Sequence, residues 1–221
     1  MAGMLYLVPT PIGNLSDISV RCRKTLEEAD FIAAEDTRVT LKLLNFLEIK
    51  KPLVSYYEHN KLESGPKIVS RIQNGETCVL VSDAGSPAIS DPGEDLVRLC
   101  AEAGLTVCAI PGPCAVITAL SISGLPTGRF CFEGFLSINK KSRQEHLTGL
   151  KTERRTMIFY EAPHKLLATL KDLSAAFGED RRVSLCRELT KLHEEVVRTT
   201  LGEAVQKYTE NAPRGEFVVV V

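Results

Sequence analysis

The stretch CVLVSDAGSPAISDPG, residues 78–93, decides the fold class of this 221-residue chain. It begins with the apolar run Cys78–Ser82, which predicts a buried strand, and continues into a loop rich in Gly and Pro. Ser90 or Asp91 then precedes the amphipathic stretch Glu94–Ala103, which predicts a helix with one of these two side chains as its N-cap. A strand, a loop and a helix in succession form the repeating unit of an α/β sheet.

The same unit recurs on both sides of residues 78–93. Four more short runs of apolar or β-branched residues are separated by amphipathic stretches of helical length. They are Leu5–Val8, Phe31–Ala34, Leu53–Tyr57 and Thr106–Ile110. Because each right-handed crossover must bury an apolar helix stripe on the sheet, this half predicts a mostly parallel sheet with helices on both faces.

The pattern changes after Pro111–Pro113. A helix is predicted over Ala115–Ser123, with Gly124 as its stop signal. Some of the strand candidates beyond it alternate polar and apolar residues, which is typical of a partly antiparallel sheet. These candidates are Phe130–Phe135, Thr156–Glu161, Val183–Arg187, Glu195–Thr200 and Glu216–Val221. The sequence therefore predicts two α/β domains, residues 1–112 and 113–221, the second with a mixed sheet.

Composition favours a soluble, cytoplasmic protein. The chain is 44% hydrophobic and 25% charged, and no run approaches the roughly 18 apolar residues of a membrane span. Its seven cysteines lack a metal-like spacing, so we expect buried, reduced thiols. The net charge of −1 is divided into −4 over residues 1–111 and +3 over residues 112–221, which favours an anionic ligand on the second half.

Common cofactor motifs are missing. The sequence contains neither GxxxxGK[ST] nor GxGxxG, which disfavours nucleoside triphosphates and nicotinamide cofactors. It has no HExxH, and its four histidines lie far apart, so we expect no metal. Gly and Pro instead gather in three loops directly after strands, at Pro9–Asn14, Asp83–Pro87 and Pro111–Pro113. Such loops either outline one ligand crevice beyond the carboxyl ends of the strands or are ordinary tight turns.

Six motifs, in order along almost the whole chain, carry a family resemblance. They are Val8–Leu15, Ala34–Arg38, Glu58–Asn60, Val81–Gly93, Phe159–His164 and Cys186–Lys191. Together they resemble the ribosomal RNA ribose 2′-O-methyltransferase branch of the tetrapyrrole methylases. The resemblance implies two α/β domains with S-adenosylmethionine in the cleft between them, a homodimer, and a cytidine ribose in the decoding region of small-subunit ribosomal RNA as the methyl acceptor.

The sequence also departs from the family pattern. Ser86 stands where Thr is usual, Cys114 where Ser is usual and Lys61 where an acid is usual. Ala162 and Lys165 replace the commoner Ser and Arg. These changes affect side-chain contacts but leave the backbone-built loops intact. The helical tail that usually follows the final Val-rich strand in the family is also expected to be absent.

The resemblance and the residue chemistry together give three sets of candidate site residues. The cofactor set carried over from the family is Asp83, Gly85, Ser86, Cys114, Ala115, Tyr160 and Ala162. A ribose hydroxyl needs a base or hydrogen-bond acceptor, for which the candidates are Glu35, Asp36, Glu58, His59, Glu161 and Glu188. The RNA-contacting set is Thr10, Asn14, Arg38, Asn60, Lys140, Lys141 and Arg143.

Structural roles and other functions remain open at this point. Glu35–Arg38 fits a capped helix start with a local ion pair, and Glu58–Asn60 fits a polar turn. The basic segment Asn139–Arg155 fits a solvated helix face equally well. The alternative activities are methylation of a tetrapyrrole carbon or a protein side chain on the same fold, and non-catalytic RNA binding.

Overall fold

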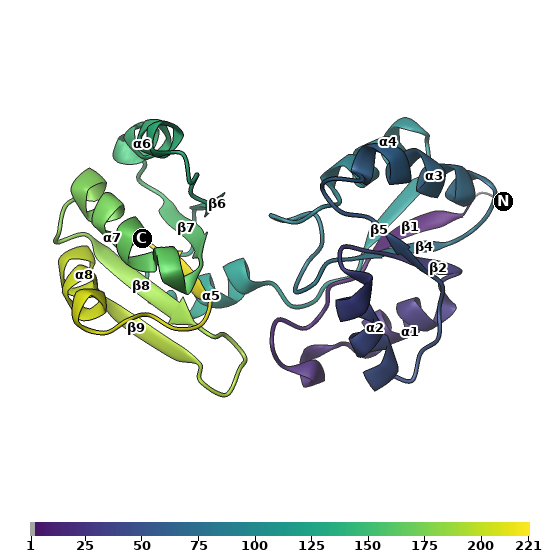
Figure 1. Ribbon diagram of the computed structural model, residues 1–221, viewed down its shortest axis with the longest axis horizontal. Helices are drawn as coiled ribbons and strands as arrows, with labels where there is room; N and C mark the ends of the chain where they lie inside the picture. Colours follow the sequence, from purple (N-terminus) through teal and green to yellow (C-terminus); the bar gives the residue numbers. More distant parts are fainter. Residues whose placement is uncertain (1–2) are drawn as a thin grey trace. The chain divides into compact units, whose positions relative to one another are not determined.

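The computed structural model describes residues 3–221, which divide into two compact units (Figure 1). The first unit ends at Cys114 and the second begins at Ala115. No helix within these residues has the length and apolarity needed to cross a membrane.

The first unit is built on a five-stranded sheet with the order β3-β2-β4-β1-β5. All of its strand pairs are parallel, as the sequence predicts. In chain order, the strands are β1 Met4–Leu7, β2 Phe31–Ala34, β3 Leu53–Ser55, β4 Cys78–Val81 and β5 Thr106–Ala109. Parallel strands place their carboxyl ends at one edge of a sheet, so the loops that follow them share that edge.

Four α-helices cover the two faces of this sheet (Figure 1). They are α1 Val20–Glu28, α2 Thr37–Phe46, α3 Lys61–Gln73 and α4 Glu94–Glu102. Successive residues of a strand point to opposite faces. In β4, Val79 and Val81 therefore pack in one core with α1 and α2, while Cys78 and Leu80 pack in the other with α3 and α4. Burial on both faces explains why the strand is a continuous apolar run.

The predicted N-cap of α4 is wrong. The helix begins after Gly93, which has a φ of 144° and makes no side-chain cap, rather than after Ser90 or Asp91. A Cβ on Gly93 would lie 2.8 Å from Leu80 Cδ2, so glycine lets the backbone approach the core closely. Asp91 instead lines a pocket beside Glu35, and burial raises the pKa of its carboxyl.

The second unit contains a mixed sheet with the order β6-β7-β10-β8-β9, which confirms the prediction. Its strands are β6 Phe130–Phe135, β7 Thr156–Glu161, β8 Arg182–Arg187, β9 Glu195–Thr200 and β10 Phe217–Val220. β6 and β7 are parallel, whereas β10 runs antiparallel to β7 and β8. β8 and β9 are also antiparallel.

Four α-helices also pack in the second unit: α5 Ala115–Ser123, α6 Lys140–Gly149, α7 Pro163–Phe177 and α8 Leu201–Glu210. Leucines of α6, α7 and α8 share one core with alternate residues of β7, such as Met157 and Phe159. The other face of the sheet meets α5, where Cys186 of β8 lies 3.8 Å from the Ala119 carbonyl oxygen. This half is therefore a second layered α/β body with its own core.

Candidate functional site

The loops after β1 and β4 are joined at the carboxyl edge of the first sheet. The Thr10 N–H donates to the Gly85 carbonyl at 2.9 Å, and the Gly85 N–H donates to the Thr10 carbonyl at 3.0 Å. Thr10 Oγ1 also donates to the Ser82 carbonyl at 3.2 Å. Gly85 has a φ of 83°, and a Cβ there would lie 3.2 Å from Ile12 Cγ2. Glycine is therefore required by both the backbone conformation and the close packing.

The loop after β5 joins the other two. Ser86 Oγ donates to the Pro113 carbonyl at 3.1 Å. A Cβ on Gly112 would lie only 2.9 Å from Pro9 Cβ, so this loop packs closely against the loop after β1. The three Gly/Pro loops thus lie together at the carboxyl edge of the first sheet, the usual position of ligand sites in open α/β sheets.

Carboxylates from neighbouring strand ends gather at the same edge. The Asp36 N–H donates to Asp83 Oδ1 at 3.1 Å, and the Asp83 N–H donates to Glu35 Oε2 at 3.4 Å. Burial and the negative charges of Asp91 and Asp83 raise the pKa of Glu35. Burial is also the main cause of the raised pKa values of Asp83 and Asp91. Raised carboxyl pKa values in a concave site are typical of functional positions.

Asp36 and Arg38 form an ion pair at the start of α2. Asp36 is the N-cap of α2, where it accepts from the Arg38 N–H at 2.8 Å. The two side chains form an ion pair with a shortest distance of 2.6 Å. These hydrogen bonds from Arg38 lower the pKa of Asp36 to about 2. A carboxylate with so low a pKa is a weak base, whereas the Arg38 side chain is 87% exposed and stays accessible to a ligand.

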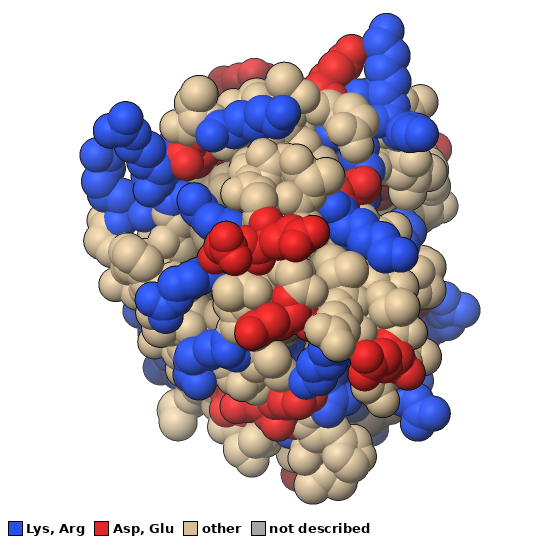
Figure 2. All heavy atoms as spheres, turned by 90° about the vertical axis from the view of Figure 1, so that its left-hand side faces the viewer, with Lys and Arg blue, Asp and Glu red and all other residues tan. Residues whose placement is uncertain are grey.

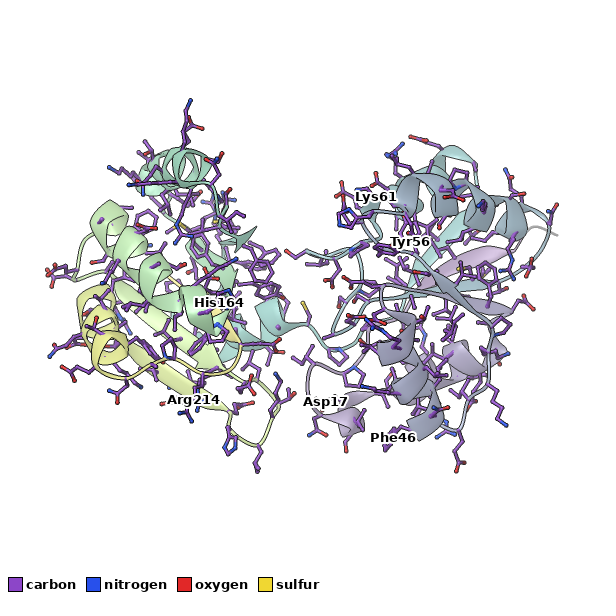
Figure 3. The ribbon with its side chains drawn as sticks, viewed as in Figure 1. Asp17, Phe46, Tyr56, Lys61, His164 and Arg214 are labelled. Carbon is purple, nitrogen blue, oxygen red and sulfur yellow. The ribbon has the colours of Figure 1, made fainter. Side chains whose placement is uncertain are left out.

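The Glu58–His59–Asn60 segment forms a polar turn between β3 and α3. Asn60 Oδ1 accepts from the Tyr57 N–H at 2.8 Å, and its amide donates to the Ser55 carbonyl at 3.0 Å. Lys61, at the start of α3 in Figure 3, pairs with Glu58 and Asp95 at 2.8 Å each. Asn60 therefore holds the turn, and Glu58 is part of an ion-pair network.

Two residues expected to contact RNA have local structural contacts. Thr10 is only 4% exposed and its hydroxyl donates to Ser82, so the prediction that its side chain contacts RNA is wrong. Asn14 accepts from the Ser16 N–H at 3.0 Å and caps a short 3₁₀ helix, Leu15–Asp17. Its side chain is exposed, so this cap leaves Asn14 accessible to a ligand.

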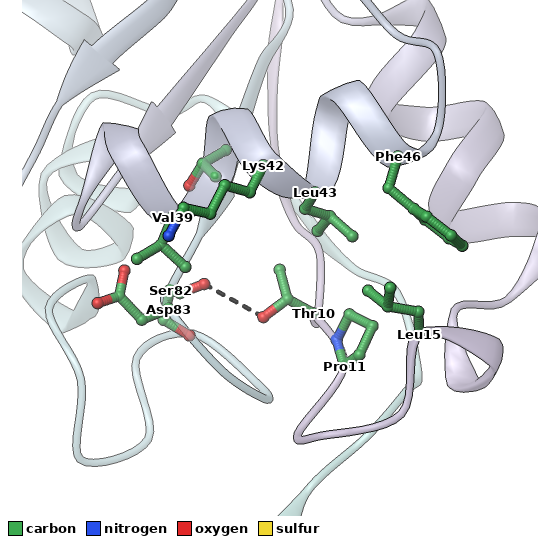
Figure 4. Close-up of a pocket in the computed structure, with 10 residues that line it drawn as sticks. Thr10, Pro11, Leu15, Val39, Lys42, Leu43, Phe46, Ser82 and Asp83 are labelled. Atoms are coloured by element: carbon green, nitrogen blue, oxygen red, sulfur yellow. Dashed lines mark hydrogen bonds between the residues drawn. The ribbon is translucent and has the colours of Figure 1, made fainter.

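A narrow, largely apolar pocket of about 230 Å³ lies beside these loops (Figure 4). It is bounded by the loop after β1, by α2 and by the end of β4. Its lining consists of Thr10, Pro11, Leu15, Val39, Thr40, Lys42, Leu43, Phe46, Ser82 and Asp83. Phe46 is 57% exposed at its rim. Sequence reasoning missed the contribution of α2, although Val39, Leu43 and Phe46 recur at helical spacing.

A second, more open pocket of about 530 Å³ lies against the ends of β2 and β3 and the loop before α4. We call it the acidic pocket. Its lining residues are Glu35, Tyr57, Glu58, His59, Ala88, Ser90, Asp91, Pro92 and Glu94. It brings together Glu35, Glu58 and His59 from the predicted set of bases. Sequence reasoning missed Tyr57 and assigned Asp91 to a helix cap.

In the second unit, Glu161 and Arg143 are buried in one network. Glu161, 4% exposed, accepts from the Ala162 N–H at 2.9 Å and from the Thr169 hydroxyl. Arg143, 9% exposed, donates to Thr169 at 2.8 Å and to Asp172 at 2.5 Å. The predictions of Glu161 as the base and of Arg143 as an RNA contact are therefore wrong, because both side chains tie α6 and α7 to β7.

The predicted cofactor residues of the second unit lie at the end of β7. The Tyr160 ring makes edge contacts with Phe132 and Phe135, at centroid distances of 4.9 and 5.5 Å. Ala162 is the N-cap residue of α7, and Pro163 fills the first helical position. Cys114 ends the first unit, and Ala115 begins α5 of the second.

The N-terminus of α6 presents the other predicted RNA contacts. Asn139 caps the helix by accepting from the Lys141 and Ser142 N–H groups. Lys140 and Lys141 are exposed, and Lys141 lies 4.0 Å from Glu145. Basic side chains on the face seen in Figure 2 are interspersed with acidic ones. Lys140 and Lys141 are exposed and therefore available to a ligand. No metal-like group of three or more His, Cys, Asp or Glu side chains occurs within residues 3–221.

The chain matches one family of known proteins over most of its length. The family model described as Tetrapyrrole (Corrin/Porphyrin) Methylases matches residues 4–205. A Synechocystis protein named Ribosomal RNA small subunit methyltransferase I is 52% identical over 219 residues, covering 99% of this chain and 78% of the relative. A Thermotoga maritima protein of the same name is 46% identical, covering 99% of this chain and 98% of the relative.

Solved structures share the fold at low sequence identity. A crystal structure of diphthine synthase has a TM-score of 0.75 and 16% identity, covering 99% of this chain and 89% of that chain. Uroporphyrin-III C-methyl transferase from Thermus thermophilus, complexed with S-adenyl homocysteine, has a TM-score of 0.68 and 18% identity. This match covers 99% of this chain and 97% of that chain.

Proposed function

Because this chain belongs to the tetrapyrrole methylases, we propose that it transfers methyl from S-adenosylmethionine to a cytidine ribose 2′-hydroxyl of small-subunit ribosomal RNA. The observation that carries the proposal is identity of 46 to 52% over almost the whole chain to relatives named Ribosomal RNA small subunit methyltransferase I. We propose the cytidine and its 2′-hydroxyl as the acceptor because the six sequence motifs resemble the ribosomal RNA ribose 2′-O-methyltransferase branch of the family.

The residues at the edge of the first sheet suit the cofactor. S-adenosylmethionine supplies, when bound, an electrophilic methyl group on a cationic sulfonium. Asp83 would attract its positively charged groups, and Gly85 would let the loop after β4 pack against Ile12 and so keep the shape of the cofactor site. Ser86 supports this loop through Pro113. Cys114, Ala115, Tyr160 and Ala162 complete the proposed set by motif.

Glu35 is the base that we propose. Within residues 3–221, Glu35 takes part in no ion pair, whereas Asp36 pairs with Arg38 and Glu58 pairs with Lys61. Burial and neighbouring carboxylates raise its pKa, which makes it a better proton acceptor than an ordinary glutamate. Glu35 would accept the hydroxyl proton as the ribose oxygen takes the methyl group, while the loops align the reactants and exclude water.

The small ribosomal subunit is the proposed partner, and we propose a homodimer acting in the cytoplasm. Asn14, Arg38, Asn60, Lys140 and Lys141 are the RNA-contacting residues that we retain, since each has an exposed or half-buried side chain. Residues 1–112 would face the RNA and form part of the cofactor site, which residues 113–221 would complete.

A transfer assay tests the proposal. The purified chain is incubated with methyl-labelled S-adenosylmethionine and unmethylated small subunits, and the RNA is then digested to nucleosides. We expect label in 2′-O-methylcytidine and at least a 100-fold loss of rate for Glu35→Gln, as for removal of a general base. Label in uroporphyrinogen but not in RNA would instead favour a small-molecule acceptor.

A further inference from the structure

The acidic pocket has a chemistry that the cofactor does not account for. Its volume of about 530 Å³ accommodates a single ring system with room for water. Four of its lining residues are carboxylates, Glu35, Glu58, Asp91 and Glu94, and none is Lys or Arg. A ligand that offers hydrogen-bond donors fits this lining, and a phosphate does not.

An aromatic wall distinguishes this pocket from a simple acidic patch. Tyr57 is 40% exposed, and its ring lies edge-on to His59 with 6.1 Å between the centroids. Both residues line the pocket together with the carboxylates. Single-stranded RNA is commonly read by stacking an unstacked base on such rings while side chains bond to its edge.

The loop before α4 forms another wall of the acidic pocket, and its backbone has an unusual conformation. Ala88 and Ser90 both have positive φ values, 69° and 58°, although neither is glycine. Asp91 lines the same wall, where burial raises the pKa of its carboxyl. Strained backbone of this kind is retained where the surrounding structure imposes it, often at ligand sites.

We propose that the acidic pocket binds the cytosine base of the target nucleotide, stacked on Tyr57, with Asp91 accepting a hydrogen bond from the exocyclic amine. This inference rests on the proposed function and assigns it a specificity determinant. Glu35 lines the same pocket, so the ribose of a cytidine bound there is within the region of the proposed base.

The charge of the pocket also explains the choice of cytosine over uracil. Cytosine presents an N4 amine, which donates to a carboxylate, whereas uracil presents a carbonyl oxygen that a carboxylate repels. A well-placed contact to a base edge discriminates by roughly 5- to 150-fold. An asparagine amide at position 91 both donates and accepts, so it tolerates either base.

The experiment compares cytidine and uridine at the target position. Small subunits are reconstituted on RNA carrying either base at the nucleotide that the wild-type chain methylates, and initial transfer rates are measured. We expect Asp91→Asn to lower the cytidine-to-uridine rate ratio at least fivefold, chiefly through KM, with unchanged S-adenosylmethionine affinity by calorimetry. Glu102→Gln, a carboxylate-to-amide change at the other end of α4, is the matched control and should keep the wild-type ratio.

Tyr57 variants give a second, independent test. Tyr57→Phe should keep most of the activity because the stacking face remains, while Tyr57→Ala should raise KM for subunits about tenfold or more. An unchanged cytidine-to-uridine ratio in folded Asp91→Asn, or equal activities of the two Tyr57 variants, would overturn this assignment. Absence of any RNA methylation by the wild-type chain would overturn the proposed function instead.

Discussion

At the residue scale, the first unit keeps carboxylates together at the end of its sheet. Glu35, Asp83 and Asp91 all have raised pKa values, chiefly because burial, and secondly because neighbouring carboxylates, disfavour their charged forms. Such a cluster reduces stability at neutral pH, which is common where function requires a strained arrangement. The sequence shows which acids follow strands, but only the folded backbone shows which of them lack a cationic partner.

We expect Glu35→Gln to stabilise the fold while it slows methyl transfer at least 100-fold. The folded state has the raised pKa, so it binds this proton more tightly than the unfolded state does, and wild-type stability falls as pH rises above the ordinary value of 4.5. Gln keeps an acceptor for the Asp83 N–H without the charge. Urea unfolding should show a gain in stability at pH 7 that shrinks towards pH 4.5. A loss of stability at pH 7 would contradict this reading.

Gly85 offers a prediction with a matched control. Gly85 and Gly104 both have positive φ, but a Cβ at Gly104 meets nothing within 4 Å, whereas one at Gly85 meets Ile12. Alanine at either position should cost about 1 kcal/mol of stability through backbone strain. Only Gly85→Ala should weaken S-adenosylmethionine binding, by about tenfold. Calorimetry on both variants checks this, and equal affinities would remove Gly85 from the cofactor site.

At the element scale, much of the fold could be predicted from the sequence. The strands Phe31–Ala34, Phe130–Phe135, Thr156–Glu161 and Glu195–Thr200 and the helix Ala115–Ser123 have the bounds that their apolar patterns predict. Phe31–Ala34 and Thr156–Glu161 are buried almost throughout, and Ala115–Ser123 buries one face. Phe130–Phe135 and Glu195–Thr200 are only partly buried, and their β-branched, aromatic and alternating residues locate them. The α4 cap could not be predicted, because it depends on contact between Gly93 and Leu80, which is a tertiary feature.

A partly buried ion pair joins α6 to α7. Asp172→Asn removes the charged partner of Arg143, whose side chain is 11% exposed against 33% for Asp172. A buried guanidinium without its carboxylate is strongly destabilising, so we expect a loss of about 3 kcal/mol in urea unfolding. Glu145→Gln, on the exposed side of α6, is the control and should change stability by less than about 0.5 kcal/mol. Similar small effects of both changes would show that the network is not structurally important.

At the scale of the whole molecule, charge alone does not identify an RNA-binding surface. The net charge is −1, and basic and acidic side chains alternate over the face in Figure 2. The sequence could predict the three loops of the site, because Gly and Pro mark strand ends. It could not separate Arg143 from Lys140 and Lys141, since only burial beneath α6 distinguishes them.

We expect the exposed lysines to contribute to RNA affinity. Lys140 and Lys141 follow β6, whose carboxyl end lies at the same edge as that of β7, because these strands are parallel. Lys140→Gln with Lys141→Gln should weaken subunit binding and reduce the slope of log affinity against log salt by roughly 1 to 2. The control pair, Arg181→Gln with Arg182→Gln, lies at the opposite edge, where β8 begins. Equal slopes for the two double variants would assign Lys140 and Lys141 to the solvated surface.

The low net charge also predicts the form in which the RNA is recognised. A chain with a net charge of −1 gains little non-specific attraction to phosphates, so binding must depend on shaped contacts such as the acidic pocket. An assembled small subunit holds its nucleotides in one arrangement, whereas free RNA must lose conformational entropy on binding.

We therefore expect faster methyl transfer to assembled subunits than to protein-free RNA of the same sequence, compared as initial rates at equal concentration. Lowering the salt should raise both rates without closing the gap, since the difference lies in preorganisation rather than in phosphate attraction. Efficient methylation of a short free oligonucleotide would contradict this expectation.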